Sequence, residues 1–468
     1  MNTVLLIVDF YKYSHWVQYP KNTTKVYSYL ESRGGKFDNT VFYGLQYYLK
    51  NYLSTPITLA DVEKAKRIVE RSVGPNIFHY EGWLRIVNYH AGKLPIRIKA
   101  VPEGKVIATH NVLATFENTD EQLPWITNFC ETLLLMVWYP TTVATLSREI
   151  KKVFLKYLRK TTTYTNEQLT PILNFMLNDF GVRGSSSPET SFIGGSAHLV
   201  NFLGTDNVGA IDFVQKYYNT DDAIGYSVPA SEHSTITSWG KEHEVDAFEN
   251  MLDAYTGIRA CVSDSFDICK AIEEYWGTVL HDKIINLNGK IVFRPDSGDP
   301  AQTLKVLFPI IWEKFRGHIN EKDYKVFHPN VGLIQGDGVN YESIGDILDV
   351  ITELGVSAEN IVFGMGGELL QKVHRDTQNF AIKCSHVVIE GREVDVQKNP
   401  LEIDKNGNRV QSFKKSKSGR LKFVNGKTVE NATDEDGDEL VLVFLNGDIL
   451  KEYTFEEVRF NAGVDLFN

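Results

Sequence analysis

Short apolar runs that end in a cluster of polar residues recur along the chain, and an amphipathic segment follows each of them. In the plainest case Lys290–Phe293 leads into Arg-Pro-Asp-Ser-Gly-Asp at 294–299, and a helix-like stretch begins at Pro300. The other runs are residues 5–8, 260–262, 333–334 and 361–363, which precede Asp9, Ser263-Asp264-Ser265, Gln335-Gly336-Asp337-Gly338 and Gly364-Met365-Gly366-Gly367. Because parallel strands present their carboxyl ends at one edge, we expect these clusters to form a single site.

The pattern outside these units changes twice. Residues 40–165 have mostly helical spacing, with a helix expected over 61–69 and a long apolar-rich segment over 125–158. Alternation predicts strands over 94–100 and 105–109. After residue 386 the pattern is all-β, with hairpin turns expected at Asn406-Gly407, Asn425-Gly426 and Asn446-Gly447.

An α/β barrel joined to an α+β domain accounts for this order most economically. The run at residues 5–8 fits the barrel as its first strand, so we assign residues 1–35 and 175–385 to a catalytic barrel. The second domain, residues 36–174 and 386–468, is then discontinuous in sequence and ends in β-hairpins.

Composition limits the class of protein. The 468 residues are 43% apolar and 23% charged, as in ordinary globular proteins. A net charge of −11 provides no overall field that would attract nucleic acid. The four cysteines form no CxxC pair, and no apolar stretch is long enough to span a bilayer. We expect a soluble cytoplasmic protein without a nucleic-acid or membrane partner.

Two of the polar clusters contain groups suited to a phosphorylated sugar. The glycines of Gly364-Met365-Gly366-Gly367 would let backbone N–H groups approach a phosphate, although a tight turn without a ligand is an equal alternative. The cluster at 294–299 is more specific, because it puts a permanent cation beside carboxylates that accept from ribose hydroxyls. A capped helix start alone would not require Arg294.

Two further segments contain candidate side chains. Phe180 and Arg183 suit a stacking platform for a flat ring beside a phosphate-binding guanidinium, with a core Phe and a surface Arg as the alternative. His233 follows Glu232 in a loop of small residues, so it is either a nucleophile or acid–base group, or a structural histidine.

These motifs resemble, in order along nearly the whole chain, those of the nicotinamide phosphoribosyltransferases, which are type II phosphoribosyltransferases. The matching segments are residues 9–12, 42–47, 179–184, 204–206, 226–234, 262–267, 294–298, 334–339 and 364–376. The resemblance implies an irregular α/β barrel in a homodimer with its sites at the subunit interface. It implies synthesis of nicotinamide mononucleotide and pyrophosphate from nicotinamide and phosphoribosyl pyrophosphate with Mg²⁺, in NAD salvage. It also implies stimulation by ATP hydrolysis through a phosphorylated histidine.

The resemblance also implies roles for individual residues. The pyridine ring would lie between Phe180 and Tyr11 of the partner subunit, and Asp206 would accept a hydrogen bond from the amide of the base. Further residues would line this pocket: Ser227, Val228 and Ser263.

The phosphate and ribose groups are assigned in the same way. Pyrophosphate would be held by Arg183, His233 and Arg294, with Asp267 orienting His233. The ribose hydroxyls would be bound by Asp296, Gly336 and Asp337. The 5′-phosphate would be held by Gly366, Gly367 and, across the dimer, Arg33, Arg375 and Lys383. No direct metal ligand is assigned.

The chain departs from the family pattern at the phosphate loop. Met365 and Glu368 stand where the family commonly has serine and glycine, and Ala381 stands where relatives have a serine near the 5′-phosphate. Two alternatives to a nicotinamide-specific transferase remain. The first is a nicotinate phosphoribosyltransferase of the same architecture. The residue at position 206, an aspartate in this chain, distinguishes the nicotinamide-specific enzyme from it. The second is a catalytically silent ligand-binding protein, against which the joint presence of the arginines, His233 and the aspartates argues.

Overall fold

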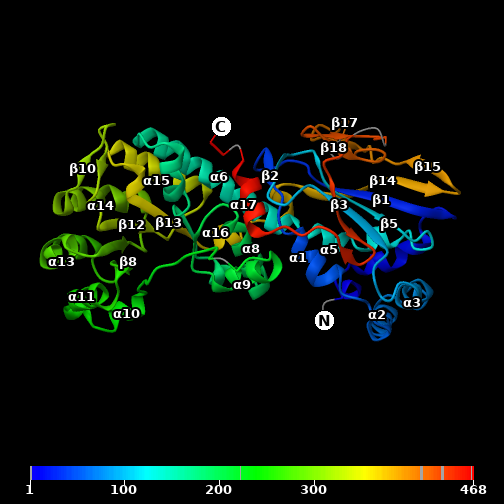
Figure 1. Cartoon of the computed structure of the whole chain (residues 1–468), viewed down its shortest axis with the longest axis horizontal. Helices are drawn as coiled ribbons and strands as arrows, with labels where there is room; N and C mark the ends of the chain where they lie inside the picture. Colours follow the sequence, from blue (N-terminus) through cyan, green and yellow to red (C-terminus); the bar gives the residue numbers. More distant parts are fainter. Residues whose placement is uncertain (1–2, 222, 412–414, 434–436, 465, 468) are drawn as a thin grey trace. The chain divides into compact units, whose positions relative to one another are not determined.

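The computed structural model describes residues 3–221, 223–411, 415–433, 437–464 and 466–467. The chain divides into two compact units (Figure 1). Unit 1 comprises Met1–Thr145, Val214–Thr220 and His374–Gly463, and unit 2 comprises Leu146–Phe213, Asp221–Val373 and Val464–Asn468. Two helices, α6 (Trp138–Thr161) and α9 (Val208–Tyr217), contain residues of both units.

Unit 2 is built on a sheet of six parallel strands in the order β7-β6-β13-β12-β9-β8. The strands are β6 (Leu177–Asp179), β7 (Gly204–Thr205), β8 (Gly257–Val262), β9 (Gly289–Arg294), β12 (Val331–Gln335) and β13 (Ile361–Met365). Four of the five predicted apolar runs are therefore confirmed as parallel strands, and their polar clusters follow the carboxyl ends.

The two edges of this sheet are bridged by one extended segment. Tyr226 pairs in parallel with Gly204 at the β7 edge, and Ala230 pairs in parallel with Ala260 in β8. The backbone N–H of Thr205 donates to Tyr226 O at 2.9 Å, and that of Ser231 donates to Ala260 O at 3.1 Å. This segment closes the sheet, which confirms the predicted irregular α/β barrel.

Helices follow the strands, as expected for parallel α/β units. The helix α14 (Pro300–Phe315) starts as predicted, with the Asp299 side chain accepting from the Gln302 N–H at 2.8 Å. The other helices of unit 2 are α7 (Asn166–Leu173), α8 (Pro188–Leu199), α10 (His233–Thr237), α11 (Glu244–Ala254), α12 (Ile268–Lys270), α13 (His281–Ile285), α15 (Tyr341–Glu353) and α16 (Gly367–Leu370). Shorter or irregular turns are the 3₁₀ segments Val182–Gly184, Lys241–His243 and Ala358–Asn360 and the π-helix Ala271–Val279, and β10 (His318–Ile319) pairs with β11 (Lys325–Val326).

The barrel interior follows from strand alternation. Residues Ala260, Val292 and Ile334 form a buried cluster on three strands, and Phe180 and Val362 pack against it. On β9, Lys290, Val292 and Arg294 share one face, so this strand presents a cation at each end of an apolar middle.

Unit 1 is built on a seven-stranded antiparallel sheet in the order β15-β14-β1-β5-β3-β20-β21. Its strands are β1 (Thr23–Ser32), β3 (Ile96–Ala100), β5 (Val112–Asn118), β14 (Phe380–Ile389), β15 (Arg392–Asp395), β20 (Val441–Leu445) and β21 (Asp448–Ile449). Two-stranded sheets add β2 (Asn39–Val41) with β4 (Val106–Ala108), β16 (Leu401–Ile403) with β17 (Arg409–Gln411), and β18 (Lys422–Val424) with β19 (Lys427–Val429). The helices are α1 (Leu45–Tyr48), α2 (Leu59–Ser72), α3 (Tyr80–Tyr89), α4 (Ile126–Phe129), α5 (Glu131–Leu135) and α17 (Phe455–Gly463), with irregular turns at Val4–Leu6, Phe10–Val17, Leu49–Leu53 and Arg375–Thr377.

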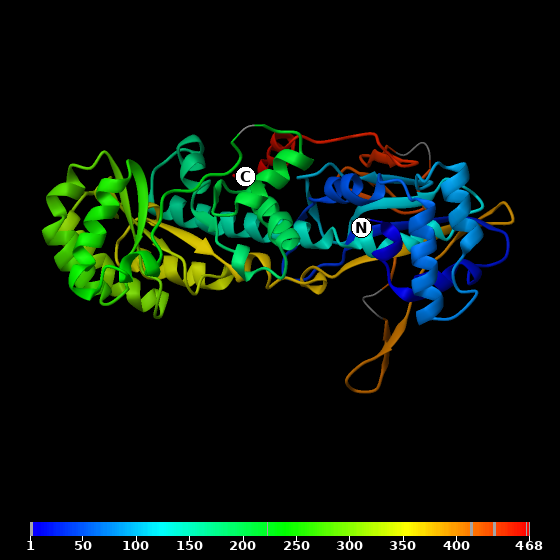
Figure 2. The same ribbon diagram turned by 90° about the horizontal axis from the view of Figure 1, so that it is seen from below.

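Local predictions in unit 1 agree with the structure. The helix over 61–69 lies within α2, and the strands over 94–100 and 105–109 contain β3 and β4. Asn425-Gly426 and Asn446-Gly447 form two-residue hairpin turns, and both residues of each pair have positive φ, as type I′ turns require. The β16–β17 hairpin, with Asn406-Gly407 in its five-residue loop, projects from the rest of unit 1 in Figure 2.

The predicted domain boundaries need correction. Residues 5–8 are not a strand, because the chain there forms a 3₁₀ turn over Val4–Leu6 that Thr3 caps. The first strand is instead β1, which pairs with β14 and β5, so residues 1–35 join unit 1. Residues 146–174 join unit 2, and residues 214–220 and 374–385 join unit 1. No helix among the described residues is both long and apolar enough to cross a bilayer.

Candidate active site

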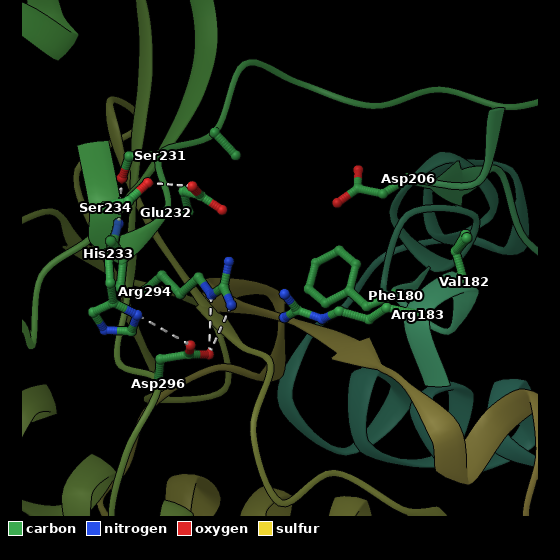
Figure 3. A pocket seen from close by; sticks show the side chains of 12 residues that line it. Phe180, Val182, Arg183, Asp206, Ser231, Glu232, His233, Ser234, Arg294 and Asp296 are labelled. Carbon is green, nitrogen blue, oxygen red and sulfur yellow. Dashed lines mark hydrogen bonds and ion pairs between the residues drawn. The ribbon is translucent and has the colours of Figure 1, made fainter. Parts of the chain in front are cut away.

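Polar side chains that follow strands of the barrel, including two from the 294–299 cluster, line a cavity of about 480 Å³ within unit 2 (Figure 3). Its lining contains six of the predicted site residues: Phe180, Arg183, Asp206, His233, Arg294 and Asp296. Val182, Ala230, Ser231, Glu232, Ser234 and Val262 complete the lining. Of the five predicted clusters, the one at 294–299 contributes to this lining, whereas residues 9, 263–265, 335–338 and 364–367 are not part of it, so the expectation of a single site stays a prediction for those four.

A second cavity of about 390 Å³ lies in the barrel interior and shares Phe180, Asp206, Ala230 and Arg294 with the first. Apolar side chains make up most of its lining, among them the buried cluster Ala260, Val292 and Ile334, and the predicted pocket residues Ser227 and Val228 also line it. Lys290 also lines this cavity, and burial lowers the pKa of its ammonium group. An aromatic ring entering from the strand ends would meet an apolar chamber.

Phe180 forms a flat platform because glycine backbone covers one side of its ring. It follows the end of β6, where its N–H donates to Met365 O at 3.0 Å. A Cβ atom at Gly364 would lie 1.9 Å from Phe180 Cε2, and one at Gly336 would lie 3.3 Å from it. Only glycine at 364 leaves room for the ring. Since Phe180 also lines both cavities, a planar ligand can stack on it, with the Arg294 guanidinium 5.8 Å from the ring centroid.

Asp206 presents a carboxylate to the same cavity. The residue is exposed, its N–H donates to Asp179 O at 3.0 Å, and its Oδ1 accepts a hydrogen bond from Ser227 Oγ. Figure 3 shows Asp206 and the Phe180 ring facing the same hollow. A ring stacked on Phe180 would thus have a hydrogen-bond acceptor near its edge.

His233, Asp264, Asp296 and Arg294 form a connected polar network. His233 Nε2 lies 3.0 Å from Asp264 Oδ1, and its Nδ1 lies 3.9 Å from Asp296 Oδ2. Arg294 donates to Asp296 Oδ1 from Nε at 3.1 Å and from Nη2 at 2.8 Å. The His233 side chain is 47% exposed, so it remains accessible while two carboxylates face its ring nitrogens.

Asp264 is the residue that orients His233, and the sequence analysis did not single it out. Its side chain is 4% exposed, and its Oδ2 also accepts from the Asp296 N–H at 3.0 Å and from Ser297 Oγ at 2.5 Å. Burial alone would raise the pKa of Asp264, but the hydrogen bonds from Ser297, Asp296 and His233 outweigh it, so the pKa is lowered. The carboxylate therefore stays ionised beside the imidazole.

Two predicted roles need correction here. Asp267 does not meet His233, because its side chain caps α12 by accepting from the Lys270 N–H at 3.0 Å. Ser263 is fully buried, and its hydroxyl donates to Cys261 O at 3.0 Å and accepts from Trp276 Nε1 at 3.1 Å. Both side chains stabilise the loop that carries Asp264.

The glycine loop packs on the segment that contains Arg183. A Cβ atom at Gly184 would lie 3.1 Å from Gly367 Cα, so the two backbones touch. The Glu368 carboxylate pairs with Lys372 at 2.5 Å, and Met365 is buried. The Glu368 carboxylate is thus engaged by a neighbour on the chain, and the Met365 side chain belongs to the core. Asp337 is exposed after the end of β12, next to Gly336 under the Phe180 ring.

Four predicted residues belong to unit 1. Tyr11 is 57% exposed, and Arg33, Arg375 and Lys383 lie in a basic group. Burial lowers the pKa of the half-buried Lys383, and the neighbouring Arg33, Lys398 and Arg375 lower it further, while Glu131 opposes them. Lys398 is a member of this group that the sequence pattern did not suggest. Ala381 is buried on β14 opposite Glu31 of β1.

Comparisons with known proteins agree on one family. Residues 175–427 match the model of the nicotinate phosphoribosyltransferase (NAPRTase) family, and residues 3–98 match the N-terminal domain of nicotinamide phosphoribosyltransferase. The chain is 46% identical to a nicotinamide phosphoribosyltransferase of Xanthomonas campestris, over 99% of this chain and 98% of that protein. It is 31% identical to a nicotinamide phosphoribosyltransferase of Acinetobacter baylyi, over 97% and 95% of the two chains.

Solved structures support the fold alone. A nicotinate-nucleotide pyrophosphorylase of Pyrococcus furiosus superposes with a TM-score of 0.57 at 16% identity, covering 98% of this chain and 94% of that one. Human nicotinic acid phosphoribosyltransferase superposes with a TM-score of 0.52 at 14% identity, covering 98% and 93%.

Proposed function

Because the chain belongs to the nicotinate phosphoribosyltransferase family and is therefore a pentosyltransferase, we propose that its base is nicotinamide. It would form nicotinamide mononucleotide and pyrophosphate from nicotinamide and phosphoribosyl pyrophosphate, in NAD salvage in the cytoplasm. The observation that carries this proposal is the Asp206 carboxylate beside the Phe180 ring. A carboxylate accepts from the amide NH₂ of nicotinamide and repels the carboxylate of nicotinate. The names of the two similar bacterial relatives support the same base.

The other residues of the cavity suit the transfer step. The bond between the anomeric carbon and the pyrophosphate oxygen breaks, and a bond from that carbon to the ring nitrogen forms. Arg183 and Arg294 would stabilise charge that builds on the leaving pyrophosphate, and stacking on Phe180 would aim the ring nitrogen. Ribose hydroxyls would donate to Asp296 and Asp337.

Magnesium would enter with the substrate phosphates. Mg²⁺ is commonly bound by one or two carboxylates together with phosphate oxygens and water. Asp296 lines the cavity and provides such a carboxylate, whereas the described part of the chain contains no group of three or more potential metal ligands. These residues therefore fit a magnesium ion that binds together with the substrate and is coordinated by both the protein carboxylate and the substrate phosphates.

The test of this function is the formation of nicotinamide mononucleotide by the purified protein, with phosphoribosyl pyrophosphate and Mg²⁺, with and without ATP. Efficient use of nicotinamide supports the proposal. Preferential use of nicotinate would favour the nicotinate phosphoribosyltransferase alternative, and absence of turnover with either base would favour a silent ligand-binding protein.

We further propose that ATP phosphorylates His233. An imidazole nitrogen would attack the γ-phosphorus, ADP would leave, and Asp264 would hold the ring and balance its charge. Hydrolysis of the phosphohistidine would then be coupled to synthesis.

His233→Ala is expected to abolish ATP hydrolysis and the stimulation of synthesis by ATP, while a slower ATP-independent synthesis remains. Both rates are measured with His243→Ala as the control, since His243 is an exposed histidine whose imidazole pairs with its neighbour Asp246. ATP hydrolysis at the wild-type rate in His233→Ala would rule out the phosphohistidine.

We also propose a homodimer in which Tyr11, Arg33, Arg375 and Lys383 complete the partner's site, as the resemblance implies. The high exposure of Tyr11 and the partly buried basic group of unit 1 support this assignment.

Mixing Tyr11→Ala subunits with Arg183→Ala subunits is expected to restore part of the activity that each variant lacks, because one site of each hybrid dimer keeps both residues. Activity of the mixture is compared with that of each variant alone at the same total concentration. A fully active monomer in sedimentation at assay concentration would contradict the shared site.

A further inference from the structure

Asp179 and Asn207 form a buried pair behind the proposed base site. Asp179 is 0% exposed and Asn207 is 1% exposed. Asp179 Oδ2 accepts from Asn207 Nδ2 at 3.1 Å, and Asp179 Oδ1 accepts from the Gly181 N–H at 2.7 Å. Neither residue lines the cavity, so neither would touch the base.

The orientation of the Asn207 amide is fixed by its other partners. Its Oδ1 accepts from the Ala210 N–H at 3.1 Å at the start of α9, and its Nδ2 also donates to Ser191 O at 2.8 Å. Its backbone N–H donates to Thr205 Oγ1 at 3.0 Å. The amide nitrogen must therefore face Asp179, because a donor already occupies the oxygen.

The pair joins the two loops that recognise the base. Asp179 immediately precedes Phe180, and Asn207 immediately follows Asp206. The backbone adds a second link, since the Asp206 N–H donates to Asp179 O at 3.0 Å. The ring platform and the carboxylate acceptor are thus held at a fixed spacing through one buried side chain.

This link is maintained at a measurable cost. Burial, with a smaller contribution from the Asp206 charge, raises the pKa of Asp179 to about 6 against the opposing effect of the hydrogen bonds from Gly181 and Asn207. No cation among the described residues pairs with this carboxylate. Gly195, in the interior of α8, makes room for the pair, because a Cβ atom there would lie 2.4 Å from Asn207 Nδ2 and 2.9 Å from Asp179 Oδ2. Glycine in a helix interior is less stable than alanine, so a glycine here indicates that the space its missing side chain leaves is needed for the pair.

We propose that Asp179 is a positioning residue for base recognition, which acts through Asn207 and Gly181 to set Asp206 and Phe180 at the spacing that a pyridine carboxamide requires. This role rests on the proposed function of Asp206 and Phe180. It predicts that damage to the pair affects the base more than the phosphate groups, because Arg183 alone among the proposed phosphate-binding residues of unit 2 follows the same strand as Asp179.

The test is Asp179→Asn, in which the new amide nitrogen meets either the Asn207 amide nitrogen or the Gly181 N–H. The KM for nicotinamide is expected to rise about tenfold to a hundredfold, the equivalent of one hydrogen bond to a charged group. The KM for phosphoribosyl pyrophosphate and the ATPase rate without base are expected to stay within about threefold. Asn207→Ala removes the same link while the carboxylate remains, and it is expected to show the same base-selective loss.

The double exchange Asp179→Asn with Asn207→Asp reverses the polarity of the pair. It is expected to lower the KM for nicotinamide at least fivefold relative to Asp179→Asn, although a carboxylate oxygen then faces Ser191 O in place of the donating amide nitrogen. Asp120→Asn is the matched control, because Asp120 is a buried carboxylate that pairs with Arg85 and His90 in unit 1. It is expected to lower the melting temperature without changing the KM for nicotinamide.

Three results would overturn the positioning role. They are an unchanged nicotinamide KM in both single variants, an equal loss in all substrates, and loss of folding in both variants, which would assign the pair to the scaffold instead. If the wild-type protein turns over nicotinate rather than nicotinamide, the proposed function fails. The positioning role is then tested with nicotinate as the base. A failure of the proposed function is thereby distinguished from a failure of the positioning role.

Discussion

Replacing Arg294 with Gln is expected to lower kcat/KM for phosphoribosyl pyrophosphate by about 10²–10³-fold, since removal of one preorganised group that stabilises transition-state charge has an effect of that size. Arg294 lies at the carboxyl end of β9 with its side chain 18% exposed, and it holds Asp296 through two hydrogen bonds. The substitution therefore removes the guanidinium that would stabilise the leaving pyrophosphate. It also frees the Asp296 carboxylate, which would bind the ribose. Both kcat and KM are expected to change.

Arg294→Lys separates these two contributions. Lysine retains the charge but cannot reproduce the paired hydrogen bonds of the planar guanidinium, so its activity is expected to lie between those of wild type and Arg294→Gln. Arg316→Gln, an exposed arginine at the end of α14, is the control for loss of a positive charge from unit 2. A kcat/KM of Arg294→Gln within threefold of wild type would remove this residue from the proposed mechanism.

The strand–cluster–helix units could be predicted because each depends on neighbouring residues. The run 290–293, the cluster that follows it and the cap at Asp299 lie within a dozen residues, and the structure reproduces all three. The Asn-Gly hairpin turns were predictable for the same reason, since the positive φ they require is a local property.

The elements that the sequence analysis missed depend on distant partners. Residues 226–230 contain proline and small residues and have no strand pattern, yet they close the barrel through single bridges to β7 and β8. Residues 5–8 have a strand-like pattern but find no strand partner. Such pairings are set by tertiary contacts, which override local preference.

The same limit applies within the site. Asp264 and Asp267 lie in one loop three residues apart, and only the path of the chain decides which of them meets His233. Asp267 enters α12 as its cap, so Asp264 is left facing the imidazole. The Asp179–Asn207 pair joins residues 28 positions apart, and no local signal marks it.

The choice of base gives the second large effect. Asp206→Asn is expected to lower kcat/KM for nicotinamide and to narrow the gap between nicotinamide and nicotinate. A like-charge contact between Asp206 and nicotinate would cost several kcal/mol once the bound base has displaced water from around the exposed carboxylate. Asparagine keeps the size of the side chain and an oxygen that accepts from Ser227, so the variant tests the charge rather than the shape. Asp206→Ser, whose shorter side chain withdraws the acceptor oxygen from the amide of the base, is expected to lose more activity with nicotinamide.

The measurement is kcat/KM for both bases at saturating phosphoribosyl pyrophosphate, with Asp212→Asn as the control. Asp212 is an exposed carboxylate on α9, six residues from Asp206, so it reports any general effect of a lost negative charge nearby. In the wild-type protein the Asp206 carboxylate would accept a hydrogen bond from the carboxamide of nicotinamide and repel the carboxylate of nicotinate. A neutral amide at position 206 would remove this repulsion and weaken the attraction for nicotinamide. If the wild-type protein uses nicotinate as efficiently as nicotinamide, or if Asp206→Asn leaves the ratio unchanged, another group in the cavity selects the base.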